Sequence, residues 1–385
     1  MNYNEIKNQV KTKGLGTYLN SLFNDNNINI KDLVNTLDNN INLENKSNLQ
    51  IKKLLKSRLF LIKRENVITS KDLNDAIKLI EKSSKIVVVS GAGISVNCGI
   101  PDFRSKGGLY DSINSLKLTE ISDPQEIFSY YVFTNHPKLF YSIVKSILPS
   151  NFSPGRAHSF IKALQDNDKL LRNYTQNIDT LERKAGITNL LECHGSFAFL
   201  ECLRCERIYN SDVDFSEMIT NGEIPVCTEN CKREYKRRRR KRKSDQTSTD
   251  TTLDITDEAI INFFDTKNEV IPFLKLTIRS PQLRTFFGED VHPDYEQNVL
   301  EDSQIVDLVL VLGTSMAVAP ISELLGMKSI RAFIKLTILA HIPHKVPVIV
   351  INNTSIKAIE PDVFLQGDID NIINDISSNL NLNQH

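Results

Sequence analysis

A glycine-rich segment followed by an acidic, an aromatic and a basic residue is the part of this chain best suited to chemistry. Residues 90–95 read Ser-Gly-Ala-Gly-Ile-Ser and directly follow the apolar run Ile86–Val89. That run is β-branched and too short for a helix, so it predicts a buried strand that turns into a helix. Unpaired backbone N–H groups at such a turn can bind phosphate. Gly91 and Gly93 would let the backbone approach a pyrophosphate closely.

The glycine pattern alone is a weak indicator. Val96 stands where a dinucleotide fingerprint has its third glycine, and such a pattern is as typical of a tight turn as of a cofactor site. Asp102, Phe103 and Arg104 follow a few residues later. They add a carboxylate, a ring and a guanidinium beside the turn, and the combination favours a nucleotide-dependent catalytic site.

His194 is a candidate general base. It follows the apolar pair Leu190–Leu191, and an imidazole with an ordinary pKa near 6.5 can accept a proton at neutral pH. The alternative is a structural histidine, which is the commoner role for a lone His. We reject a nucleophile–base pair with Cys193, because neighbouring side chains in an extended segment point to opposite faces.

Amides and a carboxylate gather at the end of another predicted strand. Residues 176–179 read Gln-Asn-Ile-Asp and follow the run Leu170–Tyr174. These groups can hydrogen-bond a carboxamide, a ribose or a water, although alone they would also fit a simple turn.

Four of the six cysteines form two closely spaced pairs. Cys202 and Cys205 are separated by two residues, and Cys227 and Cys231 by three. Two such pairs can converge on one tetrahedral Zn²⁺, and four thiolates close its coordination shell, so the metal would be structural. The alternative is four unrelated thiols, and the longer second spacing is less typical.

Composition limits the class of protein. The 385 residues carry no net charge, 40% are hydrophobic and 24% charged, so bulk attraction to nucleic acid or membrane is not expected. The first residues lack an apolar signal segment and no stretch is long and apolar enough to span a membrane, so we expect an intracellular protein. The basic run 236–243 indicates either a solvated loop or a nuclear localisation signal, and we favour the latter.

The remaining patterns predict an open, mostly parallel α/β sheet. Apolar runs at 306–312 and 346–351 alternate with helix-like segments, and one amphipathic helix is expected over Leu73–Ser83. Polar residues follow two of the runs, which suits a ligand site at the carboxyl ends of parallel strands. Residues 1–70 carry no chemical motif and predict a helical or partly disordered extension.

Together these motifs resemble the sirtuin family of NAD-dependent protein lysine deacylases. The likeness covers roughly residues 75–375 and rests on motifs in a fixed order: 91–95, 99–104, 174–179, 194–196, the four cysteines, 286–289, 313–315 and 318–320. Segments 123–128 and 158–161 look most like the fungal nuclear silencing branch, the silent-information-regulator type.

The resemblance implies a Rossmann-like doubly wound parallel sheet with a smaller inserted zinc-binding domain. The catalytic domain would span 75–385, after the helical extension 1–70. Its large domain would comprise about 75–104, 156–198 and 283–385, and its small domain the insertions at about 105–155 and 199–282, with a zinc module at 202–231.

The resemblance also implies a function: NAD-dependent removal of acetyl groups from lysine, giving nicotinamide and O-acetyl-ADP-ribose. NAD and Zn²⁺ would be the cofactors. Acetylated histone tails and proteins of a chromatin-silencing complex would be the partners in the nucleus, with no sequence-specific nucleic-acid contact and no membrane contact.

Individual roles follow from the matching positions. His194 would take a proton from a ribose hydroxyl, and Asn177 would position the ribose or a water. The implied cofactor-binding residues are Gly91, Ala92, Gly93, Ser95, Asp102, Phe103, Arg104, Tyr110, Gln176, Asn177, Ile178, Asp179, Gly313, Thr314, Ser315, Asn352, Asn353 and Ile369. The implied substrate-binding residues are Phe287, Gly288, Glu289 and Val318, which would hold the peptide as an added strand.

Departures from the family pattern keep other functions open. Residues 276–285 lack the Pro-Asp pair that the family has before its Phe-Phe-Gly-Glu segment, and 328–341 is an extra apolar-basic stretch. A catalytically impaired chromatin scaffold is therefore one alternative. An NAD-dependent ADP-ribosyltransferase or long-chain deacylase is another.

Overall fold

The computed structural model describes most of the chain outside its long insertions. The described residues are 2–25, 27–59, 62, 64, 67, 72–101, 107–145, 151–202, 207–210, 215–227, 274–277, 294–314, 341–356 and 360–380. The predictions on Asp102, Phe103, Arg104, Cys205, Cys231, Phe287, Gly288, Glu289, Ser315, Val318 and the basic run 236–243 lie outside the described residues.

A six-stranded parallel sheet forms the centre of the larger lobe. Its strands, in sheet order, are β3 (Leu190–Glu192), β2 (Leu170–Thr175), β1 (Ile86–Ser90), β7 (Leu308–Leu312), β8 (Val348–Asn352) and β9 (Val363–Gln366). Every neighbouring pair is parallel. The chain proceeds outward from β1 in one direction and from β7 in the other, which is the doubly wound order with its switch point between these two strands. The predicted fold class is confirmed in this respect.

Helices cover both faces of this sheet. On one face lie α5 (Leu73–Lys82), α9 (Arg156–Asp166) and α17 (Ile369–Asn379), whose apolar residues pack against β1, β7 and β8. On the other face lies α15 (Tyr295–Ile305), which packs through Tyr295 and Val299. Strands β1, β7 and β8 are buried at every position, as expected when both faces are covered.

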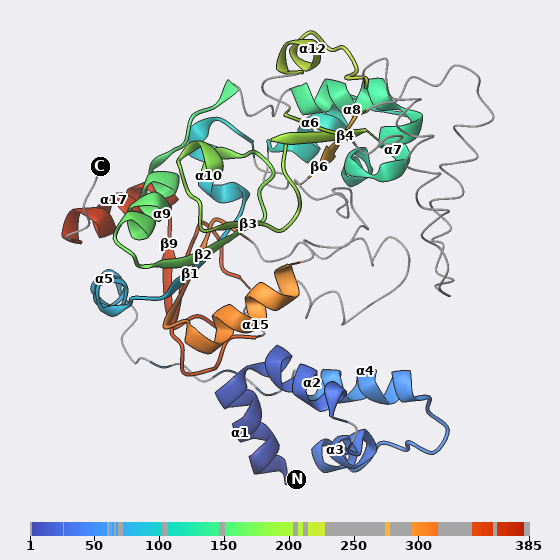
Figure 1. Cartoon of the computed structure of the whole chain (residues 1–385), viewed down its shortest axis with the longest axis vertical. Coiled ribbons are helices and arrows are strands. Elements are labelled where there is room, and N and C mark those ends of the chain that lie inside the picture. Colours follow the sequence, from blue (N-terminus) through green and yellow to red (C-terminus); the bar gives the residue numbers. More distant parts are fainter. Residues whose placement is uncertain are drawn as a thin grey trace.

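A smaller lobe stands beyond the carboxyl ends of the strands (Figure 1). It contains α6 (Leu109–Ser115), α7 (Tyr130–Asn135), α8 (Pro137–Val144), α12 (Ser216–Thr220) and an antiparallel sheet in the order β5 (Ile208–Asn210), β4 (Phe199–Cys202), β6 (Leu274–Thr277). Edge-to-face rings at Phe133, Phe140 and Tyr141 fill its core. Strand β6 includes the first two residues of the unusual segment 276–285.

The N-terminal residues form a helical unit with its own core. Helices α1 (Tyr3–Lys13), α2 (Leu15–Asn24), α3 (Ile30–Leu37) and α4 (Asn48–Leu59) bury a separate apolar cluster, and an Asn2–Glu5 capping box starts α1. Figure 1 shows the unit at the end of the molecule away from the smaller lobe, with α15 between it and the sheet.

Hydrogen bonds and an ion pair hold the N-terminal unit to the larger lobe. The His344 N–H donates to the Lys11 carbonyl at 2.8 Å, and the Thr17 and Ser303 hydroxyls are 3.5 Å apart. Arg64 pairs with Asp362, which has no exposed surface. Ser303, His344 and Asp362 precede β7, β8 and β9 in the chain, so these contacts lie toward the amino ends of those strands. Within the described part of the chain, every helix is too short or too polar to cross a membrane.

Candidate active site

The glycine turn after β1 packs directly on the turn after β7. The Gly91 N–H donates to the Leu312 carbonyl at 3.0 Å and the Gly93 N–H to the Gly313 carbonyl at 2.8 Å. A Cβ on Gly93 would lie 2.6 Å from the Gly313 Cα, and one on Gly91 2.6 Å from the Thr314 Cβ. Glycine is therefore required at both positions for backbone packing between the two central strands.

The structure departs from the expected strand-to-helix turn. The Gly91 and Gly93 N–H groups are paired with the carbonyls of Leu312 and Gly313. The helix expected after β1 is replaced by two short 3₁₀ turns, Ala92–Ile94 and Val96–Cys98. The sequence reveals the glycines but not the neighbouring strand that uses their N–H groups.

Gln176 connects three strand ends at the switch point. Its N–H donates to the Ser90 carbonyl at 2.9 Å, and its side-chain Oε1 accepts from the Thr314 hydroxyl at 3.0 Å. Its carbonyl lies 3.1 Å from His194 Nδ1. One residue after β2 thus links the ends of β1 and β7 to the histidine that follows β3.

The contact with Gln176 fixes the tautomer of His194. A carbonyl only accepts hydrogen bonds, so Nδ1 must carry the proton, and Nε2 of the neutral ring keeps its lone pair. Burial lowers the pKa of His194, which the hydrogen bond to Gln176 partly opposes. The ring is therefore neutral at pH 7 and able to accept a proton at Nε2.

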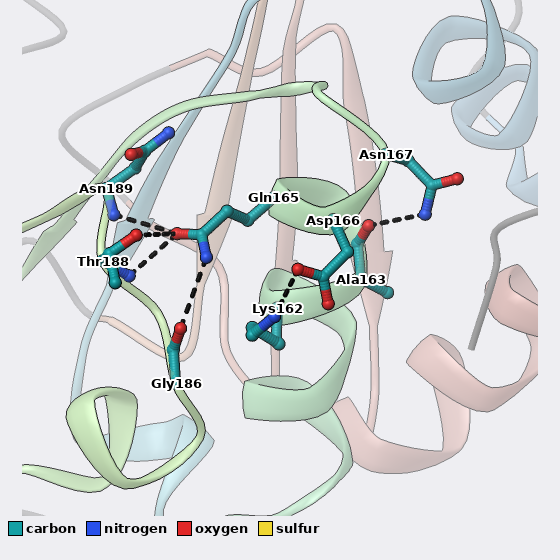
Figure 2. A network of polar contacts seen from close by, with 8 residues as sticks. All are labelled: Lys162, Ala163, Gln165, Asp166, Asn167, Gly186, Thr188 and Asn189. Carbon is teal, nitrogen blue, oxygen red and sulfur yellow. Dashed lines mark hydrogen bonds and ion pairs between the residues drawn. The ribbon is translucent and has the colours of Figure 1, made fainter. Parts of the chain in front are cut away.

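Gln165, near the end of α9, binds the turn that precedes β3 and His194. Its side-chain oxygen accepts the Thr188 and Asn189 N–H groups at 2.8 and 2.9 Å, and its Nε2 donates to the Gly186 carbonyl at 3.3 Å. Figure 2 shows this amide filling the turn that leads into β3. Cys193, next to His194, is buried in the core and its thiol pKa is raised by burial, so it is not a ready nucleophile.

Asn177 is buried, with its side-chain nitrogen turned toward the glycine turn. Nδ2 donates to the Gly91 carbonyl at 3.2 Å and lies 3.5 Å from both Ser95 Oγ and Glu182 Oε1. The Gly91 carbonyl and the Glu182 carboxylate accept hydrogen bonds, so the Asn177 side-chain atom that faces them is the Nδ2 nitrogen and not the oxygen. The amide oxygen is the atom that remains to accept from a ligand hydroxyl.

Asp179 is a buried carboxylate in the same cluster. Oδ2 accepts the Ser95 hydroxyl at 2.7 Å, and Oδ1 accepts the Leu181 N–H at 3.0 Å. Burial, and secondly the neighbouring Glu182 carboxylate, raise the pKa of Asp179 to about 6. A shift of this kind in a cluster of polar side chains is typical of functional sites.

Other predicted cofactor residues lie outside this hydrogen-bonded cluster. Asn352 ends β8 and donates from Nδ2 to the Thr354 carbonyl at 2.8 Å, while Asn353 is exposed. Ile369, at the start of α17, and Tyr110, in α6, are buried in the apolar cores of the larger and smaller lobes. Ile178 packs against the core of the smaller lobe and Ala92 is partly buried in the glycine turn.

Two of the four predicted zinc ligands are described, and both belong to the core of the smaller lobe. Cys202 ends β4, and its N–H donates to the carbonyl of Arg207, the residue before β5, at 2.9 Å. Cys227 is buried, with its sulfur 3.0 Å from the Tyr209 hydroxyl.

Sequence reasoning missed the polar layer beneath the site. Glu182 is 1% exposed, and its carboxylate accepts from Thr175 and Ser90 as well as lying near Asn177. A glutamate four residues after an Asn-Ile pair has no distinctive spacing. Its role becomes visible only in the fold, where the short helix α10 (Leu181–Lys184) places Glu182 near the ends of β1 and β2.

Comparison with known proteins decides the family. The model described as Sir2 family matches residues 91–320, more than half of the chain. The chain belongs to the Sir2 family. The matched range contains the glycine turn, Asn177, Asp179, His194 and all four paired cysteines.

Curated Sir2-family relatives match most of this chain. It is 36% identical over 322 residues to the NAD-dependent histone deacetylase sirtuin-1 of Drosophila melanogaster, covering 83% of this chain and 34% of the relative. It is 37% identical over 298 residues to the NAD-dependent histone deacetylase SIR2 of Candida glabrata, covering 77% and 53%. The human NAD-dependent protein deacetylase sirtuin-1 is 34% identical, covering 80% and 34%. The chain thus spans between a third and about half of these relatives' length.

Solved Sir2 structures share the fold. One, titled as a Sir2 variant with a deacetylated peptide and 3'-O-acetyl ADP ribose, has a TM-score of 0.56 at 20% identity and covers 81% of this chain and 100% of its own. A second, titled for the mechanism and regulation of Sir2 enzymes, has a TM-score of 0.53 at 22% identity, covering 80% and 96%.

Proposed function

We propose that this Sir2-family protein is an NAD-dependent protein lysine deacetylase that forms nicotinamide and O-acetyl-ADP-ribose. The observation that carries the proposal is the neutral His194, with Nδ1–H bound to the Gln176 carbonyl and Nε2 free to act as a base. The relatives in fly, human and Candida glabrata are named as NAD-dependent deacetylases, which supports the same reaction here.

The residues at the strand ends fit NAD. The switch point between β1 and β7 is where doubly wound sheets bind dinucleotides, and Asn177 presents an amide oxygen there that suits a ribose hydroxyl. When bound, NAD supplies the ribose carbon that takes the acetyl oxygen as nicotinamide leaves. Asp102, Phe103, Arg104 and Ser315 would line this cofactor site with the residues described above.

His194 and Asn177 would divide the work on the ribose. Nε2 of His194 removes a proton from a ribose hydroxyl, because the tautomer leaves that nitrogen unprotonated. Asn177 Oδ1 accepts a hydrogen bond from a hydroxyl or a water and fixes its orientation. Asp179, which accepts a hydrogen bond from Ser95, would line the nicotinamide side of the site.

Zinc would be structural. Cys202 and Cys227, with Cys205 and Cys231, supply four thiolates, a closed set with no open position for substrate. The buried position of the two described thiols in the smaller-lobe core supports a metal that stabilises that lobe. The lobe boundaries proposed from the sequence would then be a small domain at about 105–155 and 199–282 within a catalytic domain 75–385.

The proposed substrates are acetylated histone tails, bound as an added strand by Phe287, Gly288, Glu289 and Val318. The Candida glabrata relative is named as a histone deacetylase, which supports this substrate class. We further propose a nuclear role in chromatin silencing, with the basic run 236–243 as the import signal and silencing-complex proteins as partners.

Mass spectrometry of an acetylated histone-tail peptide, incubated with the purified protein with and without NAD, tests the proposal. Loss of the acetyl mass only with NAD, together with O-acetyl-ADP-ribose, is expected. An ADP-ribosylated peptide, or no reaction by a folded and zinc-loaded protein, would contradict it.

A further inference from the structure

Glu182 is a buried carboxylate without a cationic partner. It is 1% exposed, and among the described residues no lysine or arginine forms an ion pair with it. The adjacent Arg183 instead pairs with Glu192, through contacts of 2.8 and 2.6 Å. An uncompensated buried charge costs free energy of folding, and burial accordingly raises the pKa of Glu182. Its presence therefore calls for an explanation other than stability.

The Glu182 carboxylate collects donors from both central strands and from the loop that follows them. Oε1 accepts from the Thr175 hydroxyl at the end of β2. It also lies 3.3 Å from the Ser90 hydroxyl at the end of β1, whose single proton is shared with the Asn173 side-chain oxygen at 3.0 Å. The third donor is Asn177 Nδ2, at 3.5 Å. Thr175 is anchored in turn, since its Oγ1 accepts the Asn177 N–H at 3.0 Å. Glu182 thus lies under both the backbone and the side chain of Asn177.

The surroundings of Asn177 Nδ2 determine which way the amide faces. Reversing the amide would bring Oδ1 against the Gly91 carbonyl and the Glu182 carboxylate, two acceptors that would repel it. The Ser95 hydroxyl cannot reverse this preference, because it already donates to Asp179. With the Gly91 carbonyl on one side and the Glu182 carboxyl oxygen on the other, the reversed orientation is the unfavourable one.

We propose that Glu182 is a positioning residue, which holds Asn177 with its amide oxygen toward the cofactor ribose. It acts through Asn177 and touches neither cofactor nor substrate. This role rests on the proposed deacetylase function for its catalytic consequence, whereas the orientation of the Asn177 amide does not depend on any reaction.

Glu182→Leu removes the acceptor, Glu182→Gln keeps a neutral one, and Glu192→Gln is a control at another buried glutamate that does not contact Asn177. We expect kcat to fall about tenfold in Glu182→Leu and about threefold or less in Glu182→Gln, with little change in the KM for peptide. In an Asn177→Ala background, Glu182→Leu should change kcat less than twofold. Multiplicative effects in this cycle would overturn the proposal.

An activity-independent measurement separates this proposal from the proposed function. In protein labelled with ¹⁵N-asparagine, the Asn177 side-chain amide signal, assigned by its loss in Asn177→Ala, should shift in Glu182→Leu and stay nearly in place in Glu192→Gln. An unchanged signal in folded Glu182→Leu would overturn the positioning role even if the enzyme is active. A shifted signal in a protein without deacetylase activity would uphold the positioning role and refute the proposed function.

Discussion

Ser95 donates a 2.7 Å hydrogen bond to Asp179, joining the turn after β1 to the loop after β2 across the switch point of the sheet. Both residues are buried, and Ser95 also lies next to the amide nitrogen of Asn177. The turn and the loop are thereby fixed relative to each other before any ligand binds. A site held in this way is preorganised for its ligand. The arrangement costs free energy of folding, because the Asp179 carboxylate is buried.

That cost predicts a pH-dependent stability effect. The pKa of Asp179 is raised from 3.8 to about 6, so the penalty for ionising it is absent below pH 4 and complete above pH 6. Asp179→Asn keeps both contacts, because the Ser95 hydroxyl can also accept. We expect its melting temperature to exceed wild type by about 3 °C at pH 7.5 and to match it near pH 4, with NAD-dependent activity reduced.

Asp375→Asn, at an exposed site on α17, is the control and should show no such pH dependence. Equal stabilisation by Asp179→Asn at both pH values would exclude relief of a buried charge as its cause.

The packing of the two central turns predicts a large effect from one methyl group. In Gly93→Ala the added carbon would meet the backbone of Gly313 at 2.6 Å, and backbone atoms cannot rotate away. We expect a loss of about 1–3 kcal/mol in the free energy of unfolding and at least tenfold weaker NAD binding by calorimetry. Gly222→Ala, whose Cβ would meet nothing within 4 Å, should cost stability only through its positive φ and leave NAD affinity unchanged. Normal NAD affinity in Gly93→Ala would show that the two turns can move apart without weakening NAD binding.

The attachment of the N-terminal unit depends on a buried ion pair. Arg64 contacts Asp362 at 2.6 Å and also donates to the Val346 carbonyl, while the Asp362 side chain has no exposed surface. Arg64→Ala leaves that carboxylate with no ion-pair partner among the described residues, so we expect chemical denaturation to show a loss of about 3–5 kcal/mol. Arg58→Ala removes a partly exposed pair with Asp38 and should cost about 1 kcal/mol or less. Similar losses in the two variants would mean that the Arg64 contact contributes no more than a surface pair.

Zinc content gives a test of the smaller lobe. Cys202→Ala should lower bound zinc from about one equivalent toward zero by elemental analysis, and destabilise the lobe, because structural zinc contributes directly to folding. Cys98→Ala, a partly buried thiol outside the two pairs, should retain its zinc. A fully zinc-loaded Cys202→Ala protein would remove Cys202 from the ligand set.

The sequence predicts the central sheet well because β1, β7 and β8 are continuous apolar runs buried on both faces. Strand β9 was not predicted, since Val363–Gln366 is short and only partly buried. The three-stranded sheet of the smaller lobe joins β4 to a strand more than 70 residues later along the chain, and no local pattern encodes that pairing.

The sequence indicates candidate residue types for the site, but not the hydrogen bonds among them. His194, Asn177 and Asp179 stand at strand ends, where sequence and topology together indicate function. The pairing of Gly91 and Gly93 with the turn after β7, and the position of Glu182 beneath Asn177, depend on contacts between segments distant in sequence.

The base role of His194 is tested most directly by NAD-dependent deacetylation of an acetylated histone-tail peptide, measured by mass spectrometry for wild type, His194→Ala and His136→Ala. His136, between α7 and α8 in the smaller lobe, is the matched control. We expect His194→Ala to lose about 100-fold or more in kcat, with folding and zinc content intact, and His136→Ala to remain within about twofold of wild type. Wild-type activity in a folded His194→Ala protein would contradict the mechanism.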